Sequence, residues 1–494
     1  MPSPGTPGAS AVFSRELREF LRSPEPEVTL FEHMVAAVEA CRSRSADDKP
    51  ATWPTGEPLR LLLVGYSGAH NIGADIRVAE MVRQFRHVFG PDRIDFELLA
   101  IGEHRLAEQP PDVTTTRADG YLPQLLVNRI ATADGVLACE GSMFKSDFSN
   151  MLALLLTGGL AVASAQRKLA LAWGAEAGAM DDRLRDFTRR FCRDALVVAR
   201  NPPSERALAG HGLRTFLGAD PAWTYRPSQA GRAEELLRGV GWDGAAAVTC
   251  VCPVNPFWYP VRPDLARARE LARTGAHRGD HFASVLFHEN SPDSVRHYEH
   301  YLDELARSIR ERTARPGQFA VLLGMEMLDR RACEDLAARL PAGAPVLLGD
   351  RLDAADVVAL LRRSDLVISS RYHAILTAIP GLTPAIGVFH DERISNLLGE
   401  LGRPDLGVPV GASDLGDQVT AAIAAAEADP DGLRQAQGRL VAEQVRRIGV
   451  SGRQAAVEVG RVYPGFHAAD TTSGWNRFVP PVDTVVEELL ERYA

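Results

Sequence analysis

Lysine is scarce in this chain. Only Lys49, Lys145 and Lys168 are lysines, and the remaining 52 of the 55 basic residues are arginines. Such an imbalance is most simply explained by a GC-rich coding sequence. A lone arginine is therefore weak support for a phosphate site, and its position in the fold has to supply the argument.

The sequence also lacks an excess of positive charge. Its 55 basic and 64 acidic residues give a formal net charge of −9. A broad nucleic-acid-binding surface requires clustered basic charge, so we expect no nucleic-acid partner.

Paired cysteines and long apolar runs are missing as well. None of the six cysteines forms a C-x-x-C pair, which argues against a zinc site and favours buried thiols in a reducing cytoplasm. The longest apolar stretch, Met151 to Ala165, is interrupted by Gly158-Gly159 and is too short for a transmembrane helix. The N-terminal residues are rich in proline and glycine and resemble neither a signal peptide nor an anchor. We therefore expect a cytoplasmic protein without a transmembrane segment.

What the sequence does contain is an alternation of short apolar runs with helical stretches. With 494 residues, of which 45% are hydrophobic and 24% charged, it has enough length for two or three globular domains. The alternation predicts an α/β fold with parallel sheets in two Rossmann-like domains. The expected divisions are an N-terminal extension with a disordered start and a helix (1–58), a first Rossmann-like domain (59–228), a second one (229–447) and a C-terminal extension (448–494).

The first domain opens with an apolar strand that runs into a glycine-rich loop. Gly68, Asn71 and Gly73 lie in this loop, just before a predicted helix. Glycines allow a ligand to approach the backbone, and amides at a helix start can bind an anion. The spacing is not G-x-G-x-x-G and no P-loop lysine follows, so a nicotinamide or ATP site is poorly supported. A tight structural turn is the alternative.

Polar residues follow several other predicted strands of this domain. Glu140, Glu176 and Arg200 each come just after an apolar run. Carboxyl ends of parallel strands share one edge of the sheet, where open α/β sheets bind ligands. These three residues are therefore candidates for contacts with a ligand.

The most informative stretch lies at 364–388. A short apolar strand ends in Ser369-Ser370 and is followed by Arg371, His373, a short apolar helix and Pro380-Gly381. An arginine and a histidine at this strand–helix junction predict an anion site, helped by the helix amides and dipole. The alternative is a pair of polar residues that merely cap the junction.

At this point the chain resembles the polysaccharide pyruvyl transferase family. The family's Ser-x-Arg-x-His-Ala-like motif is similar to Ser369-Ser370-Arg371-Tyr372-His373-Ala374, and its Gly-x-Pro turn to Gly381-Leu382-Thr383-Pro384. The family's opening Gly-x-x-Gly-x-x-Asn-x-Gly-Asp loop resembles residues 65–74. A further succession of Arg, Ser and Asp-Pro is similar to Arg200, Ser204 and Asp220-Pro221.

The resemblance implies a GT-B-type arrangement with substrates in an interdomain cleft. It also implies a transferase that moves the enolpyruvyl-derived group of phosphoenolpyruvate onto a sugar or related hydroxyl acceptor as a ketal. Arg371 would bind a donor anion and His373 would deliver the proton. Gly68, Asn71, Gly73, Arg200, Glu140, Glu176 and Ser370 would contact the substrates, with Asp75, Glu140 or Glu176 as the acceptor's base. Phosphoenolpyruvate is a co-substrate, and no cofactor or metal is expected.

The sequence departs from the family pattern in several places. Ala74 occupies the position of an acid, with Asp75 one residue later. Cys139-Glu140-Gly141-Ser142 replaces a glycine cluster, and the segment from Asn255 to His300 is longer than expected. Two alternatives therefore stay open, a GT-B glycosyltransferase that uses a nucleotide sugar and a catalytically degenerate binding member. The acceptor's identity and a homo-oligomeric state also stay open.

Overall fold

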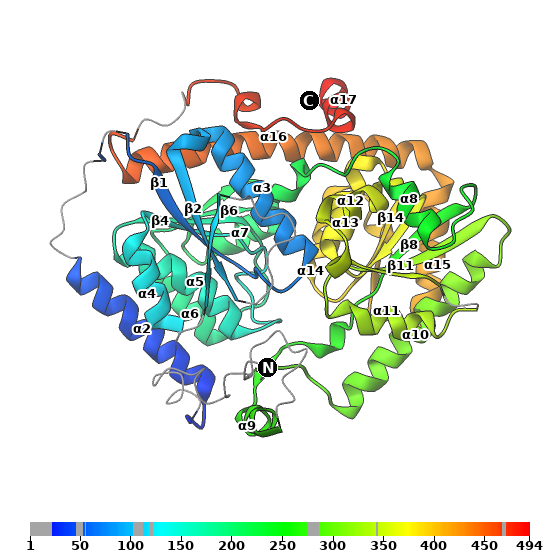
Figure 1. Cartoon of the computed structure of the whole chain (residues 1–494), viewed down its shortest axis with the longest axis horizontal. Helices are drawn as coiled ribbons and strands as arrows, with labels where there is room; N and C mark the ends of the chain where they lie inside the picture. The colour runs from blue at the N-terminus through cyan, green and yellow to red at the C-terminus, as the bar shows by residue number, and fades with distance from the viewer. Residues whose placement is uncertain are drawn as a thin grey trace, which may run out of the picture.

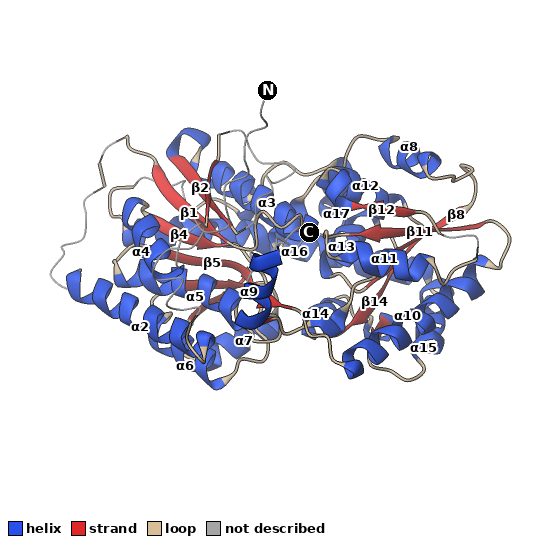
Figure 2. Cartoon of the chain, turned by 60° about the horizontal axis from the view of Figure 1, so that its bottom comes forward, coloured by secondary structure: helices blue, strands red, loops and turns tan. Residues whose placement is uncertain are grey.

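The computed structural model describes residues 22–45, 53–54, 56–101, 112–118, 122–274, 286–341, 344–466 and 471–494. Within them lie two parallel β-sheets side by side, each with helices on both faces (Figure 2). The predicted α/β class with two Rossmann-like domains is confirmed.

The first sheet has seven parallel strands in the order β3-β2-β1-β4-β5-β6-β7. This is the doubly wound order: β2 and β3 are added on one side of β1, and β4 to β7 are added on its other side. Every strand from β4 to β6 is fully buried, as expected for apolar runs covered on both faces. The strands are β1 Leu59–Val64, β2 Ile94–Ala100, β3 Thr114–Arg117, β4 Gly135–Ala138, β5 Leu169–Ala175, β6 Leu196–Ala199 and β7 Arg214–Leu217.

Two apolar cores cover the faces of this sheet. The helices are α2 Pro26–Arg44, α3 Ile72–Phe89, α4 Leu122–Thr132, α5 Asn150–Ala165, α6 Asp182–Phe191 and α7 Pro202–Gly210. Helix α2 packs on α5 where Met34 of α2 meets Gly158 of α5. A side chain at position 158 would clash with the Met34 sulfur. The predicted N-terminal helix is thus part of the body of the first domain, and residues 1–21 lie outside the described residues.

The second sheet repeats the same order with six parallel strands, β12-β11-β8-β13-β14-β15. Its strands are β8 Ala247–Cys252, β11 Gln318–Gly324, β12 Val346–Leu348, β13 Leu366–Ser369, β14 Ala385–Phe389 and β15 Gly407–Pro409. Its helices are α8 Arg232–Gly239, α10 Pro292–Thr313, α11 Asp329–Ala337, α12 Ala354–Arg363, α13 Tyr372–Ala378, α14 Glu392–Glu400 and α15 Leu415–Ala428.

The long segment after β8 forms a small unit outside the main sheets. It contains η3 Pro256–Trp258, β9 Arg262–Pro263, α9 Leu265–Thr274 and β10 Leu286–Phe287, and β9 pairs antiparallel with β10. Figure 1 shows α9 at the bottom, between the two domains. Main-chain contact to the first domain comes from Val261, whose N–H donates to the Phe148 carbonyl at 2.8 Å.

One long helix joins both domains. Helix α16 (Pro430–Val462) runs along the top of the molecule in Figure 1 and is followed by η7 Trp475–Phe478 and α17 Thr484–Tyr493. Its first half buries Leu440 and Val441 in the core of the second domain, and its second half buries Val459 in the first. The expected division at residue 447 falls inside this helix, which continues without a break. The GT-B-type arrangement therefore consists of two Rossmann-like domains and a C-terminal helix that returns to the first domain.

No helix in the described part of the chain combines the length and apolar character needed to cross a membrane.

Candidate functional site

The glycine-rich loop of the first domain docks onto the second domain. Asn71 caps α3 by accepting from the Ala74 amide at 3.1 Å, and its Nδ2 donates to Glu326 Oε2 at 3.0 Å. The Ile72 amide donates to the Met325 carbonyl at 2.9 Å. Gly68 has φ +87°, a left-handed conformation that favours glycine. The sequence predicts that Asn71 contacts a ligand. In the structure its side chain instead forms a hydrogen bond with the second domain.

Gly73 brings α3 of the first domain against α13 of the second. A Cβ added at Gly73 would lie 2.2 Å from His373 Nδ1, so only glycine permits this approach. The predicted role of Gly73 was close approach by a ligand, and here the close approach is made by the catalytic candidate itself. Helix α13 has only seven residues, so its dipole gives little help to an anion.

His373 faces a buried carboxylate from the first domain. Its Nε2 lies 3.7 Å from Asp220 Oδ2, and no described residue forms a hydrogen bond with this nitrogen. Burial lowers the pKa of His373, an effect that Asp220 opposes. The imidazole is therefore biased toward its neutral form.

Asp220 belongs to a buried set of charges that we call the Asp220 cluster: Arg77, Glu176, Arg200 and Asp220. The guanidinium of Arg77 pairs with Asp220 and donates to the carbonyls of Cys139 and Trp173 at 3.0 and 2.7 Å. Burial alone would raise the pKa of Asp220, but Arg77, His373 and Arg200 outweigh it and hold the pKa far below its usual range. Asp220 is thus an anion in the folded protein.

Arg200 and Glu176, both predicted to contact substrates, bind each other in this cluster. Arg200 donates to Glu176 through Nε at 2.6 Å and to Asp220 through Nη1 at 3.0 Å, and its guanidinium lies 4.0 Å from the centre of the Tyr372 ring. Glu176 also accepts from Asn201 at 3.0 Å and from Asn396 of the second domain at 2.8 Å. Gly141 allows the approach of Arg200, because a Cβ there would lie 2.5 Å from Nη1.

Arg371 lies at the same domain boundary, paired with two carboxylates. Its Nε donates to Asp329 at 2.9 Å, its Nη2 forms an ion pair of 2.8 Å with Glu326, and 18% of its side chain is exposed. Glu326 also accepts from Tyr66 of the first domain at 3.0 Å. Ser370, the other predicted residue of this motif, is buried and shares a hydrogen bond of 3.0 Å with Tyr301.

A second group of charges crosses the boundary nearby, and we call it the Lys145 cluster: Lys145, Asp391, Glu392 and Arg393. Lys145 Nζ lies 3.1 Å from Asp391 and 2.6 Å from Glu392, and its side chain is completely buried. Arg393 donates to Asp391 at 2.8 Å and is 19% exposed. Both cations lie over the ring of Phe148, at 4.9 and 4.6 Å from its centre.

His390 lines the same cluster. Its ring centre lies 6.0 Å from that of Phe148, and its Nε2 lies 3.7 Å from Asp391. Burial lowers the pKa of His390 from 6.5 to about 4, and Asp391 only partly opposes this shift. The imidazole is neutral above pH 5.

Sequence reasoning missed Lys145, Glu326 and Asp329. A signal existed for Lys145, because it is one of three lysines in an arginine-rich chain. Glu326 follows the carboxyl end of β11, so the strand-end argument used for Glu140 would have found it. Glu140 is half-buried and accepts from the Ser142 amide at 3.3 Å. The described residues contain no group of three or more His, Cys, Asp or Glu side chains that could hold a metal ion.

Solved structures with a similar fold were found at low identity. The putative UDP-N-acetylglucosamine 2-epimerase of Listeria monocytogenes is 14% identical, with a TM-score of 0.49 and coverage of 82% of this chain and 96% of that one. Anabaena HepE, in complex with UDP-glucose, is 15% identical, with a TM-score of 0.49 and coverage of 81% and 99%. Similarity at this level carries no functional information. No curated protein sequence matches the chain.

The family comparison is more specific. The model of the family described as polysaccharide pyruvyl transferase matches residues 108–388. This range covers more than half of the chain and includes Arg200, Asp220, Arg371 and His373. The chain belongs to the polysaccharide pyruvyl transferase family.

Proposed function

We propose that this protein transfers the pyruvyl-derived group of phosphoenolpyruvate onto two hydroxyls of a sugar acceptor, forming a ketal and releasing phosphate. The observation that carries the proposal is the joint position of Arg371 and His373 at the domain boundary. Arg371 is partly exposed there, and His373 lies 3.7 Å from the Asp220 anion of the opposite domain. The transferase class is that of the family.

The donor carries a phosphate and a carboxylate and therefore needs two cationic contacts. Arg371 and Arg393 follow the adjacent strands β13 and β14, at the edge where open α/β sheets bind ligands. Both guanidiniums are partly exposed, and both are planar forks suited to phosphate or carboxylate. A bound donor would compete with Glu326 and Asp391 for these forks.

His373 is proposed to deliver a proton to the donor's methylene carbon. Its pKa is lowered in the free protein, and a donor with two anionic groups would raise it again. Asp220 stays ionised beside the ring and stabilises the imidazolium, much as an aspartate supports a histidine in other acid–base pairs. Binding of the donor would thus charge the acid that the reaction requires.

The remaining steps balance without another reactant. After protonation the methylene carbon is a methyl group, and one acceptor hydroxyl attacks the adjacent, oxocarbenium-like carbon. The carbon–oxygen bond to phosphate breaks, and the second hydroxyl attacks the same carbon to close the ketal. One acceptor proton replaces the proton from His373, and the other leaves with phosphate. Glu140 is better suited than Glu176 as the base, because Glu176 already accepts from Arg200, Asn201 and Asn396.

A thermal-shift screen of the full chain tests the donor. Phosphoenolpyruvate should raise the melting temperature, since a ligand that binds only the folded state stabilises it. UDP-glucose serves as the competing donor class. Stabilisation by UDP-glucose alone would overturn the proposal in favour of a glycosyltransferase.

Substitution of His373 tests the acid. His373→Gln should bind phosphoenolpyruvate within a fewfold of wild type and lose phosphate release. The matched control is His33→Gln, which replaces an exposed histidine on α2. Phosphate release at the wild-type rate in His373→Gln would remove His373 from this role.

A further inference from the structure

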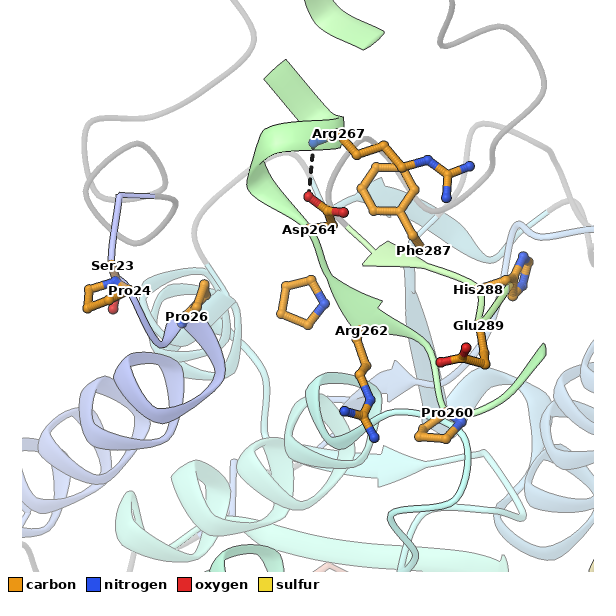
Figure 3. Close-up of a pocket in the computed structure, with 11 residues that line it drawn as sticks. Ser23, Pro24, Pro26, Pro260, Arg262, Asp264, Arg267, Phe287, His288 and Glu289 are labelled. Atoms are coloured by element: carbon orange, nitrogen blue, oxygen red, sulfur yellow. Dashed lines mark hydrogen bonds between the residues drawn. The ribbon is translucent and has the colours of Figure 1, made fainter. Parts of the chain in front are cut away.

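A cavity of about 400 Å³ lies between the start of α2 and the β9–β10 pair (Figure 3). Its volume falls in the range of roughly 300–1,000 Å³ that is usual for small-molecule sites. One wall is formed by Ser23, Pro24 and Pro26, which precede or open α2 and lie outside the part matched by the family. The opposite wall comes from the long segment after β8. No catalytic candidate lines this cavity.

The polar groups in the cavity include both donors and acceptors. Arg262 is exposed and has no ion-pair partner among the described residues. Asp264 and Glu289 face the same space, and each uses one oxygen on a local amide, that of Arg267 at 2.9 Å and that of Ser291 at 3.0 Å. Two carboxylates beside the arginines disfavour a strongly anionic ligand. Alternating donors and acceptors suit the hydroxyls of a neutral sugar.

The cavity also has an apolar side. Phe287 lines it, with the Arg267 guanidinium 4.5 Å from the ring centre. His288 is stacked on Trp258 with ring centres 4.6 Å apart and an angle of 19° between the rings. Pockets that combine such ring surfaces with a few placed polar groups are typical of small organic ligands.

A short layer of aromatic residues connects this cavity to the proposed transfer site. The Tyr259 ring lies 6.0 Å from His288 on one side and 5.0 Å from Phe148 on the other. Phe148 in turn lies under Lys145 and Arg393 of the Lys145 cluster. Pro260, the next residue, lines the cavity itself. Tyr259 and Phe148 are both partly exposed, so a chain-like ligand can lie across these side chains from one place to the other.

We infer that this cavity binds a distal sugar unit of an oligosaccharide acceptor whose reacting sugar lies at the Arg371–His373 site. This inference rests on the proposed function for the position of the reacting sugar. According to this inference, the long segment after β8 and the start of α2 together determine which acceptor is bound.

Binding of the full-length protein to an array of neutral oligosaccharides of two to six sugar units tests the inference. Wild type should bind at least one member, and titration calorimetry with that member should show binding at least tenfold weaker for Arg262→Ala and for Glu289→Gln. Arg273→Ala is the matched control: Arg273 lies on α9, pairs with Glu270 and does not line the cavity. Its affinity should equal that of wild type.

The outcomes separate this inference from the proposed function, because phosphoenolpyruvate binding is measured on the same proteins. No bound oligosaccharide, or equal affinities in wild type and both cavity variants, would overturn the inference even where phosphoenolpyruvate binds. Binding of inorganic phosphate at Arg262 without any oligosaccharide would overturn it as well. Oligosaccharide binding that depends on Arg262, with no binding of phosphoenolpyruvate, would support the sugar site and contradict the proposal that phosphoenolpyruvate is the donor.

Discussion

The Asp220 cluster and the Lys145 cluster contain the same charges in different settings. Each combines two cations with two carboxylates. In the Asp220 cluster all four side chains are at most 1% exposed, and all come from the first domain. In the Lys145 cluster Arg393 and Glu392 are partly exposed, and the partners come from both domains.

The difference shows which cluster can change its partners. Charges that are fully buried lose a great deal when one partner is removed, so the Asp220 cluster is a fixed support beside His373. A partly exposed pair exchanges a carboxylate for water or for a ligand anion at a much lower cost. The Lys145 cluster therefore suits a place where the donor binds, and the following predictions test this contrast.

The largest expected effect comes from Arg77→Met. It leaves Asp220 with one arginine and removes the hydrogen bonds to three buried carbonyls, so the free energy of unfolding should fall by about 3–5 kcal/mol. Chemical denaturation measures this loss. Arg60→Ala is the control, because Arg60 is 60% exposed in its pair with Asp134 and such pairs contribute about 0–1 kcal/mol. Equal losses in the two variants would contradict the contrast.

Gly73→Ala should affect the reaction more than the fold. The new Cβ would occupy space 2.2 Å from His373 Nδ1, so the imidazole or α3 has to move. A displacement of about 1 Å at a reacting group costs on the order of 100-fold in rate, and we expect such a drop in kcat for phosphate release. Gly239→Ala is the matched control, since its Cβ would meet no atom within 4 Å. A kcat near wild type would show that His373 needs no fixed position.

Arg393→Gln should weaken the binding of phosphoenolpyruvate and leave the stability of the fold nearly unchanged. Lys145 stays beside Asp391 in this variant, and water can solvate the partly exposed Glu392, so the loss of stability should be small. Loss of one charged hydrogen bond costs about 1.5–3 kcal/mol, which corresponds to a rise of at least about tenfold in the KM for phosphoenolpyruvate. Steady-state kinetics and a thermal melt measure the two effects. An unchanged KM would place the donor away from the Lys145 cluster.

The effect that is smallest at neutral pH concerns stability, and it grows only as the pH falls. The pKa of His390 is about 4 in the folded protein and 6.5 ordinarily, so between these values the unfolded chain binds a proton that the folded chain does not. Stability should therefore fall as the pH drops from about 6.5 to about 4, by at most about 1.4 kcal/mol per pH unit for this group. His390→Gln should reduce that slope. A stability difference between wild type and variant that stays constant over this range would contradict the prediction.

Much of the fold could be predicted from the sequence, because buried parallel strands are short apolar runs with clear ends. The apolar strand predicted before the glycine-rich loop and the one predicted to end at Ser369 are observed as β1 and β13. Strand β3 was missed, since Thr114–Arg117 is polar and lies at an exposed edge. Such a strand is defined by its pairing with β2, which the sequence does not display.

For the site, the sequence identified the positions but not the partners. Arg371, His373, Arg200 and Glu176 all lie at the domain boundary, where the strand-end argument predicted a ligand site. The sequence could not indicate that Arg200 would be satisfied by Glu176, because that pairing depends on the close approach allowed by Gly141. The roles of these residues toward substrates stay predictions.

Helix α16 has a consequence for how this chain is made. The core of the first domain includes Ala455, Val459, Tyr463 and Phe466, which follow the last strand of that domain by more than 200 residues. At about 5–20 residues per second, a ribosome takes roughly 10–50 s to synthesise the intervening residues. During that interval α3 covers this face of the first sheet only in part, because the C-terminal residues of the same core are still missing. The nascent first domain is therefore expected to depend on chaperones until the second domain has emerged.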